Sequence, residues 1–388
     1  DVDRSRGLGD VYKRQTKNLF KLANSVAENF VSNNLLDYQG LRNYDYGPEK
    51  RDNVSCLSPF ITHRLILEQE LIKRSLDFYP FAKIEKFIQE IYWRTYWKGW
   101  LELRPAVWED FISERVEIYD ETVYEKAING NTGIDCFDFW INELKEENYL
   151  HNHTRMWFAS IWIFTLGLPW QLGAEFFMKY LLDGDAASNT LSWRWVAGIQ
   201  TKGKHYIARP SNISKFTDGR FHPKGLNTVA ESLNGEKEYL KEPLDLTFNE
   251  TKKNNTLVMF ENDLWLEGRE NLYKSYENIY LILLTNADRK IELDEKVLAF
   301  KKKALNDVQT YLDNSSLESP ERLQQHKSFD VVYPSVGENL DYLREVQKIN
   351  NTDINFITRE EDVFCWEFSN KGFFNSVSYT HLTLPTNA

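Results

Sequence analysis

Apolar residues in roughly the first 240 positions recur with the spacing of α-helices. They fall three and four residues apart in segments 81–100, 136–144 and 156–166, and that spacing places them on one face of a helix. Glycine and proline fall mainly between such segments, as at residues 167–169, where they end helices. This half of the chain is therefore predicted to be helical.

After a polar stretch the pattern changes to short apolar runs that are typical of strands. Two segments with helical spacing, 294–312 and 337–350, lie between these runs. Strands that alternate with helices predict a parallel sheet with both faces covered. The predicted fold class is mainly α, with a helical domain followed by a smaller α/β domain. The runs predicted as strands are residues 256–260, 279–285, 329–333 and 354–357.

The change of pattern sets the expected domain boundaries. The helical domain is predicted over residues 16–240, a linker over 241–255 and the α/β domain over 256–375. The two ends, residues 1–15 and 376–388, share no period or helix cap with their neighbours. They are interpreted as non-native sequencing or cloning scars on a fragment, and they do not enter the fold prediction.

Charge is unevenly distributed along the chain. The 388 residues carry a formal net charge of −11, which argues against a protein that coats nucleic acid with its whole surface. Residues 101–150 hold 4 basic and 13 acidic residues, whereas residues 151–240 hold 10 basic and 7 acidic residues. A local basic groove in the second segment stays open as an interpretation, with solvated helix faces as the alternative.

Cysteine count and hydropathy bear on the compartment. The three cysteines, Cys56, Cys136 and Cys365, lie far apart, which argues against a disulfide scaffold and against a four-thiolate metal site. No apolar run reaches the roughly 18 residues of a membrane span. We therefore expect a cytoplasmic protein without a membrane segment, and we predict no metal site.

Two short segments place polar and aromatic side chains together on helical faces. Glu90, Trp93 and Arg94 stand at i, i+3 and i+4, so they share one face of a helix. Because a surface helix rarely exposes tryptophan, such a face is predicted to look into a pocket or a core. The same spacing recurs in the set Asn152, Arg155 and Met156.

A third segment, residues 183–195, adds acids, small residues and two tryptophans. Asp183 would neutralise Arg155, because a buried guanidinium needs a carboxylate. The small residues 186–188 would let a flat ligand approach the backbone. Trp193 and Trp195 lie two residues apart, so one would contact a cofactor while the other faces a substrate.

Four motifs now stand in order along the chain: NVSCLSPF, EIYWRTYW, HNHTRM and DGDAASNTLSWRW. Together they resemble the FAD-binding domain of the DNA photolyase/cryptochrome family. The likeness runs from about Tyr46 to Trp195, with a fainter continuation to Asn227. The resemblance implies a helical domain that binds FAD, and it leaves the antenna chromophore unknown.

The resemblance assigns one set of residues to the cofactor. Ser55 and Ser58, with backbone N–H groups at a helix start, would hold the FAD diphosphate, while Val54 replaces the family's threonine and loses one hydroxyl contact. Asn189 would face the flavin N5. The alternative for each residue is a helix cap or a surface pair. The full cofactor set is Tyr46, Arg51, Val54, Ser55, Leu57, Ser58, Arg94, Asn152, Arg155, Asp183, Asp185 and Asn189.

A second set matches positions that contact a cyclobutane pyrimidine dimer in the repair enzymes. The implied function is light-driven repair of damaged DNA, in which reduced FAD donates an electron and Glu90 hydrogen-bonds the base edge. Aromatic side chains would stack on the flipped bases, at about 1–3 kcal/mol per base. The (6-4) branch carries histidines where Asn152 and Met156 stand, which favours the cyclobutane dimer. The substrate set is Glu90, Trp93, Asn152, Met156 and Trp195.

The resemblance also implies electron transfer to the flavin. Trp193 and Trp170 match the inner and middle members of the family's tryptophan chain, and the outer member is left open among three residues. The catalytic set is Glu90, Asn189, Trp193 and Trp170. The candidates for the outer member are Trp108, Tyr119 and Tyr124.

Several departures keep other functions open. His153 stands where repair enzymes often carry arginine, and the loop after Trp195 differs from the family pattern. A cryptochrome-like photoreceptor with a signalling partner is the first alternative, and a homologue without FAD is the second.

The family's antenna domain normally precedes the helical domain. Here residues 257–268 resemble its opening strand and loop, with an unrelated α/β module as the alternative. The altered loop and its flank carry basic residues that would meet DNA phosphate or remain solvated: Lys202, Lys204, Arg209, Lys215, Arg220 and Lys224.

Overall fold

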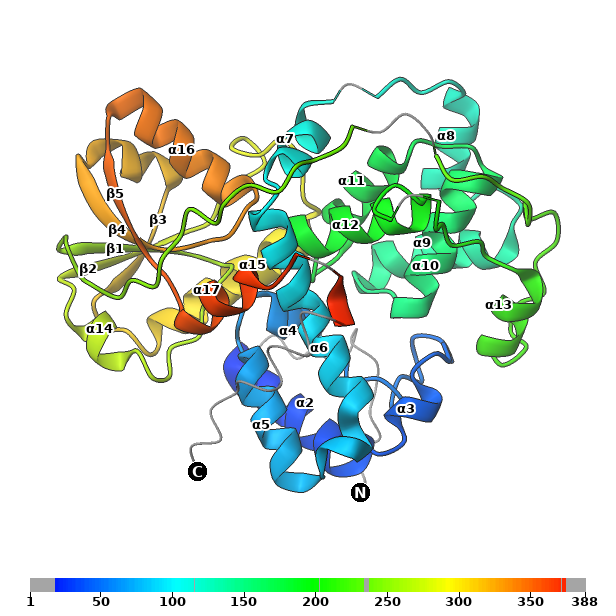
Figure 1. Ribbon diagram of the computed structural model, residues 1–388, viewed down its shortest axis with the longest axis horizontal. Helices are drawn as coiled ribbons and strands as arrows, with labels where there is room; N and C mark the ends of the chain where they lie inside the picture. The colour runs from blue at the N-terminus through cyan, green and yellow to red at the C-terminus, as the bar shows by residue number, and fades with distance from the viewer. Residues whose placement is uncertain (1–17, 115, 202, 234–236, 371, 375–388) are drawn as a thin grey trace.

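A helical unit comes first along the chain and a unit built on a parallel sheet comes second (Figure 1). This computed structural model describes residues 18–114, 116–201, 203–233, 237–370 and 372–374. Both segments interpreted as scars lie outside the described residues. The mainly helical fold with a C-terminal parallel sheet confirms the predicted fold class.

The helical unit contains the three helices that the spacing of apolar residues predicted for this half of the chain, at 81–100, 136–144 and 156–166. The segment 156–166 differs in detail, because it ends in the π-helical turn η1, where the Leu166 N–H donates to the Ile161 carbonyl at 2.9 Å. Gly167, with φ +68°, and Pro169 then end the helix. The helices of this unit are α2 (Leu19–Asn33), α3 (Tyr38–Leu41), α4 (Ser58–Thr62), α5 (Glu68–Phe78), α6 (Phe81–Glu102), α7 (Ala106–Ser113), α8 (Glu121–Ile128), α9 (Asp135–Glu147), α10 (Asn152–Ser160), η1 (Ile161–Thr165), α11 (Trp170–Tyr180), α12 (Ala186–Ala197) and α13 (Pro210–Phe216).

Helix α12, which carries much of the predicted site, has sharply defined ends. The Asp185 carboxylate accepts from the backbone N–H groups of Ala187 and Ser188 at 3.0 and 2.9 Å, and this is the usual N-terminal cap of a helix. Gly198 ends the helix in the left-handed region at φ +81°, where glycine carries no Cβ penalty.

The second unit holds a five-stranded sheet in the order β3-β2-β1-β4-β5, in which every neighbouring pair is parallel. Four strands were predicted within a few residues, and β3 was missed because Ser-Ser-Leu-Glu forms no apolar run and stays half-buried at the sheet edge. The elements are β1 (Thr256–Phe260), α14 (Glu270–Lys274), β2 (Asn278–Ile282), α15 (Glu295–Gln309), β3 (Ser315–Glu318), the 3-10 turn η2 (Pro320–Gln325), β4 (Ser328–Val332), α16 (Glu338–Asn350), β5 (Asp353–Ile357) and α17 (Glu360–Glu367).

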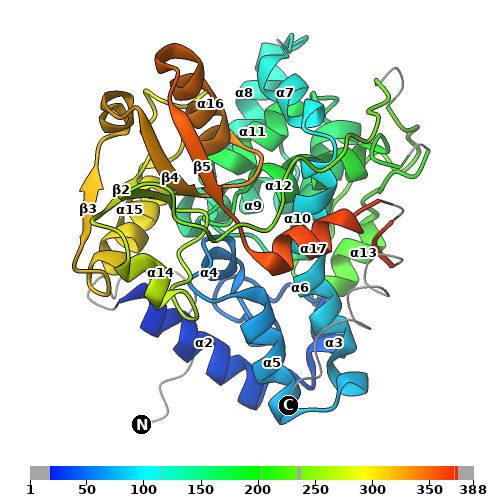
Figure 2. The same ribbon diagram turned by 60° about the vertical axis from the view of Figure 1, so that its left-hand side comes forward.

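Buried ion pairs join the two units. Arg64, in the turn after α4, pairs with Asp263 at 2.8 Å and with Asp362 of α17 at 2.6 Å. Within the sheet unit, Arg359 also pairs with Asp263, at 2.6 Å, and so orients this partner of Arg64. All four side chains are buried, and α17 lies alongside α6 in both ribbon views (Figures 1 and 2). The sheet unit is therefore docked on the helical unit through specific charged contacts.

Among the described residues, no helix combines the length and the apolar character that a membrane crossing requires.

Candidate flavin site

Two ion pairs lie next to each other where α4, α6, α10 and the start of α12 meet. Arg155 of α10 donates to the Asp183 carboxylate at 2.9 Å, and its Nε also donates to the Leu150 carbonyl at 3.0 Å. Arg94 of α6 donates to Asp185 at 3.1 Å. The structure thus brings together the Arg155–Asp183 pair that the sequence predicted, with a second pair beside it.

Asp183 is held as a carboxylate. Its side chain is buried, and burial by itself would raise its pKa. The positive charges of Arg155 and Arg94 outweigh that effect and lower the pKa. Asp183 therefore carries a full negative charge at neutral pH.

Several polar atoms around these pairs are buried without a hydrogen-bond partner in the described chain: Asp183 Oδ1, Arg94 Nε and Ser188 Oγ. Buried polar groups are normally paired, so such a set is matched to a polar ligand. One carboxylate acceptor, one guanidinium donor and one hydroxyl suit the C=O and N–H groups of an isoalloxazine edge. The residues present therefore fit the flavin ring edge of FAD.

The predicted phosphate-binding stretch forms a tight turn into α4. Cys56 adopts the left-handed region at φ +52°, and the Leu57 N–H lies 3.4 Å from the Ser55 hydroxyl, its acceptor. Ser58 is the first residue of α4, while Val54 lies between Arg51 and Ser55 and donates its N–H to the Arg51 carbonyl at 3.1 Å. The turn and the helix start thus lie together, as the sequence predicted.

Two further predicted cofactor residues have partners of their own. The Tyr46 ring stacks on Tyr44 with centroids 5.5 Å apart, and the Lys50 ammonium lies 4.7 Å from its centroid. Arg51 is buried, where it forms an ion pair with Glu143. A cofactor role for Tyr46 and Arg51 stays a prediction.

Asn189 and Trp193 occupy the buried face of α12. Asn189 Nδ2 donates to the Ala174 carbonyl of α11 at 2.8 Å, which fixes the orientation of its amide. Trp193 is 2% exposed, and Gly173 of α11 lies against its ring, leaving no room for a Cβ. Trp195 is only partly buried, so the two tryptophans face different ways, as predicted.

The predicted substrate residues of α6 are in contact with other parts of the chain. Glu90 forms an ion pair with Arg42. The Trp93 ring stacks on Phe373, with centroids 3.7 Å apart and planes 5° from parallel, and Phe373 is itself buried. Neither contact was predicted, because the partners lie far away along the sequence.

The remaining predicted substrate residues lie on α10 and α12. Asn152 is exposed and Met156 is half-buried on α10. The Trp195 ring stacks on Tyr206 with centroids 6.0 Å apart, and the Tyr206 hydroxyl lies 3.4 Å from His153 Nε2. Sequence reasoning missed Tyr206, although its place in the altered loop after Trp195 was a usable signal.

One of the basic residues proposed for phosphate contact has an internal role. Arg220 pairs with the buried Asp45 at 3.0 Å and donates to the Asp45 carbonyl at 2.8 Å. The Arg220 side chain is therefore held by contacts within the protein, whereas the side chains of Lys204 and Lys224 are exposed. Lys202 lies outside the described residues.

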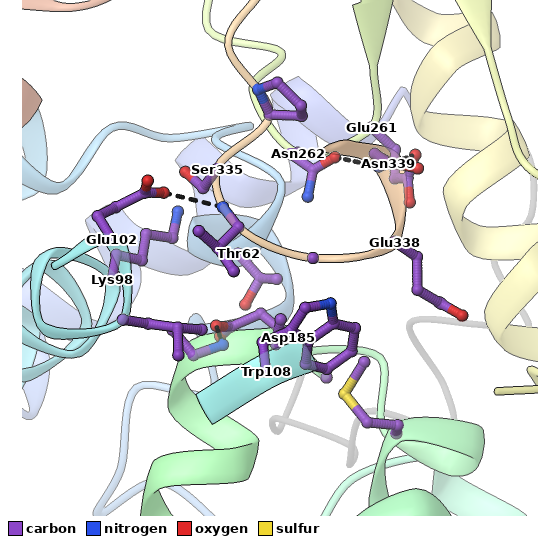
Figure 3. A pocket seen from close by; sticks show the side chains of 18 of the residues that line it. Thr62, Lys98, Glu102, Trp108, Asp185, Glu261, Asn262, Ser335, Glu338 and Asn339 are labelled. Atoms are coloured by element: carbon purple, nitrogen blue, oxygen red, sulfur yellow. Dashed lines mark hydrogen bonds between the residues drawn. The ribbon is translucent and has the colours of Figure 1, made fainter. Parts of the chain in front are cut away.

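A cavity of about 50 Å³ lies between the two units and shares Asp185 with the candidate flavin site (Figure 3). Lys98 and Glu102 of α6, with Thr62 and Asp185, face it from the helical unit. Burial is the main cause of a lowered pKa for Lys98, and burial raises the pKa of Glu102 to about 7. The lining from the sheet unit includes Glu261, Asn262, Ser335, Glu338 and Asn339.

Sequence reasoning did not predict this cavity. The signal was available, because residues 261–262 follow the predicted strand at 256–260 and residues 334–337 follow the predicted strand at 329–333. The carboxyl ends of neighbouring parallel strands meet at one edge of the sheet, and the strand order reverses between β1 and β4. Crevices form at such a point.

Comparison with known proteins points to a part of the chain that contains both ion pairs of the candidate site. Residues 87–260 match the family described as the FAD binding domain of DNA photolyase. The deoxyribodipyrimidine photo-lyase of Buchnera aphidicola subsp. Baizongia pistaciae is 29% identical over 177 residues, which cover 42% of this chain and 36% of that protein. The deoxyribodipyrimidine photo-lyase of Streptomyces griseus is 33% identical over 152 residues, 39% of this chain and 33% of that one. The match thus spans about a third of each relative's length.

Solved structures give similar coverage. A bacterial class III photolyase from Agrobacterium tumefaciens is 27% identical with a TM-score of 0.44, covering 50% of this chain and 42% of that chain. A cryptochrome from Synechocystis is 21% identical with a TM-score of 0.46, covering 51% of this chain and 43% of that chain.

Proposed function

We propose that this chain binds FAD and uses light to split pyrimidine dimers in DNA, because its residues 87–260 belong to the DNA photolyase/cryptochrome family. FAD is the cofactor that this domain implies. The choice of cyclobutane dimers as substrate rests on the residues that match the family's lesion contacts.

One observation carries the proposal of a flavin site. The Arg155–Asp183 and Arg94–Asp185 pairs stand together with buried polar atoms that lack protein partners. A buried charged group without its full set of hydrogen bonds is costly, so a ligand that completes the set would be bound strongly. Asn189 lies on the helix that begins directly after Asp185, and its hydrogen bond to the Ala174 carbonyl fixes the orientation of its amide.

When bound and reduced, FAD would supply the electron that opens the dimer under light. The chain's own residues would hold the substrate: Trp195, with Tyr206 stacked behind it, offers an aromatic surface for a flipped base. Glu90 would accept a hydrogen bond from a base edge once it leaves Arg42. Trp93 would offer a second aromatic surface once Phe373 leaves it.

A blue-light photoreceptor without repair activity is the second candidate, and one observation favours it. Phe373 stacks on Trp93 and thereby covers an aromatic surface that the repair function needs. The variant Phe373→Ala separates the two functions. Repair predicts tighter binding of dimer-containing DNA by this variant than by the wild type, and unchanged weak binding by both proteins would favour the photoreceptor.

The flavin site is tested with two substitutions in one helix. Ser188→Ala removes a buried hydroxyl that has no protein partner, so the fold should keep its stability. If this hydroxyl bonds FAD, affinity should fall by about 1 kcal/mol, or roughly fivefold. Thr190→Val is the matched control, because its hydroxyl also lacks a partner but lies two residues away, on another face of α12. Equal affinity in all three proteins, measured by flavin fluorescence, would contradict this site.

The substrate is tested by illuminating the reduced, FAD-loaded protein with dimer-containing oligonucleotide. Repair should restore the absorbance of normal thymine, and Glu90→Gln should lower the repair yield without changing FAD affinity. A flavin-loaded protein that restores no thymine would remove the repair function and leave the photoreceptor.

A further inference from the structure

A line of aromatic rings leads from Trp193, on the helix that also carries Asn189, to the surface. The Trp193 and Trp162 ring centroids lie 6.3 Å apart, with their planes nearly perpendicular. The Trp162 and Tyr124 centroids lie 6.1 Å apart, also edge to face. Trp193 and Trp162 are fully buried, whereas Tyr124 of α8 is half-exposed. The line thus connects a buried indole to a phenol at the solvent boundary.

The residue matched to the family's middle tryptophan is placed differently. Trp170 stacks on Phe111, with centroids 5.5 Å apart, and the Arg194 guanidinium lies 5.8 Å from its ring. Among the described residues, no comparable ring contact joins Trp170 to Trp193. A cation near the ring also opposes positive charge on Trp170, so this branch is a poor path for a hole.

We propose that electrons reach the photoexcited flavin from Tyr124 through Trp162 and Trp193, a route that rests on the proposed FAD function. Trp193 gives one electron to the flavin and becomes a radical cation. Trp162 returns an electron to Trp193, and Tyr124 returns one to Trp162. The Tyr124 phenol then releases its proton to water and remains a neutral radical, which a small-molecule thiol reduces by donating a hydrogen atom.

The hydrogen-bond partners give the route its direction. The Trp193 indole N–H is buried without an acceptor, and the Trp162 N–H donates to the Pro169 carbonyl at 2.9 Å, which is not a base. Neither oxidised indole has a group that takes its proton, so each stays a strong oxidant of the next residue. Tyr124 reaches solvent and can lose its proton, which ends the transfer there.

The charges around Tyr124 support this end point. Burial is the main cause of its raised pKa, and the carboxylates of Glu175 and Glu125 raise it further. The same negative charges favour a positive hole arriving at this ring. Of the other two candidates for the outer member, Trp108 is fully buried, with its N–H bonded to Asp341. Tyr119 is 89% exposed, so the structure favours Tyr124.

The test uses the full chain loaded with FAD and illuminated with thiol present. Laser-flash absorption and electron paramagnetic resonance should show a tyrosyl radical, and Tyr124→Phe should abolish it. Trp162→Phe should abolish the tyrosyl signal and most of the lasting flavin reduction, with a larger loss than in Trp170→Phe. Trp140→Phe is the matched control, because Trp140 is equally buried but stacks on Trp157. A loss in Trp170→Phe that exceeds the loss in Trp162→Phe would overturn the route.

The same route is measured in the apoprotein, so its failure is separable from a failure to bind FAD. Azide radicals made by pulse radiolysis oxidise tryptophan, and the hole should then move to tyrosine. The tyrosyl yield should fall in Tyr124→Phe and in Trp162→Phe relative to Trp140→Phe. Equal yields in these three variants would overturn the route even if FAD binds. A protein without flavin uptake that still shows these falls would contradict only the proposed function.

Discussion

Replacing Glu102 by glutamine should stabilise the protein at high pH and not at low pH. Glu102 lies at the junction of the two units, where one carboxylate oxygen accepts from the Tyr333 hydroxyl and the other from the Val336 N–H, each at 2.8 Å. Burial raises its pKa from 4.5 to about 7, and these two hydrogen bonds only partly oppose that effect. The folded protein therefore keeps this carboxyl protonated over a pH range where the unfolded chain releases the proton.

The magnitude follows from the two pKa values. For an acid whose folded pKa is raised, the stabilising contribution is complete below the unfolded pKa of 4.5 and is lost as pH rises to about 7. That interval corresponds to about 3 kcal/mol of free energy of unfolding. Glutamine is neutral at every pH but replaces one acceptor oxygen with an NH2 group, which costs about 1 kcal/mol. The net expectation for Glu102→Gln is a gain of about 2 kcal/mol at pH 8 and a small loss at pH 4.5.

Urea unfolding followed by circular dichroism at these two pH values measures both numbers. Glu109→Gln is the control, because Glu109 is exposed and its pair with Arg344, at 3.6 Å, is a surface contact worth little. A Glu102→Gln variant that is less stable than the wild type by the same amount at both pH values would refute the reasoning. Such a result would mean that the carboxyl is charged in the folded protein.

Two further substitutions test buried contacts, one in the ion pairs around Asp263 and one between α11 and α12. Asp263→Asn should lower the free energy of unfolding at pH 7 by about 3–5 kcal/mol, because it leaves Arg359 buried without a carboxylate and removes one partner of Arg64. These guanidinium groups hold the pKa of Asp263 far below its usual range. The loss of unfolding free energy caused by Asp263→Asn should therefore shrink as pH falls. A loss below about 1 kcal/mol at pH 7 would contradict this expectation. Gly173→Ala should destabilise the protein by about 1–3 kcal/mol, because the new Cβ would overlap the Trp193 ring. Thermal unfolding checks this, and a rise in melting temperature would show that helix propensity, about 1 kcal/mol in favour of alanine, decides instead.

The local pattern of apolar residues predicted four of the five strands. The missed strand, β3, shows what such a pattern cannot predict. Strands β1, β2 and β4 carry apolar runs because both of their faces are covered, while β5, partly buried at the other edge of the sheet, still holds three apolar residues. β3 lies at the sheet edge, is only half-buried and holds a single leucine. Its place depends on pairing with β2, which no local pattern encodes.

The contacts of the candidate site also fall into those that the sequence predicted and those that it did not. The sequence predicted the Arg155–Asp183 pair, because a buried arginine needs an acid and a motif supplied one. It did not predict that Phe373 stacks on Trp93, because the two residues are far apart in the sequence and the end of the sheet unit reaches α6 only in the tertiary structure, where α17 lies alongside α6 (Figure 2). The Arg155–Asp183 contact, which joins two motifs of the helical unit, was therefore predictable, whereas the contact between the units was not.

The interface between the units depends on charges whose partners no local pattern reveals. A lone arginine in a sequence is usually solvated, yet Arg64 donates two hydrogen bonds to Asp362 at 2.7 and 2.6 Å, and Arg359 donates two to Asp263 at 2.6 and 2.7 Å. A planar guanidinium makes two such bonds to one carboxylate only in a narrow range of orientations. The Arg64–Asp362 pair joins the two units and therefore sets the angle at which the sheet unit docks, while the Arg359–Asp263 pair orients Asp263, the second partner of Arg64, within the sheet unit. Apolar burial supplies most of the attraction. The segment that connects the two units needs only enough length to span the distance between them. The docked arrangement therefore does not require that the sheet unit precede the helical unit along the chain.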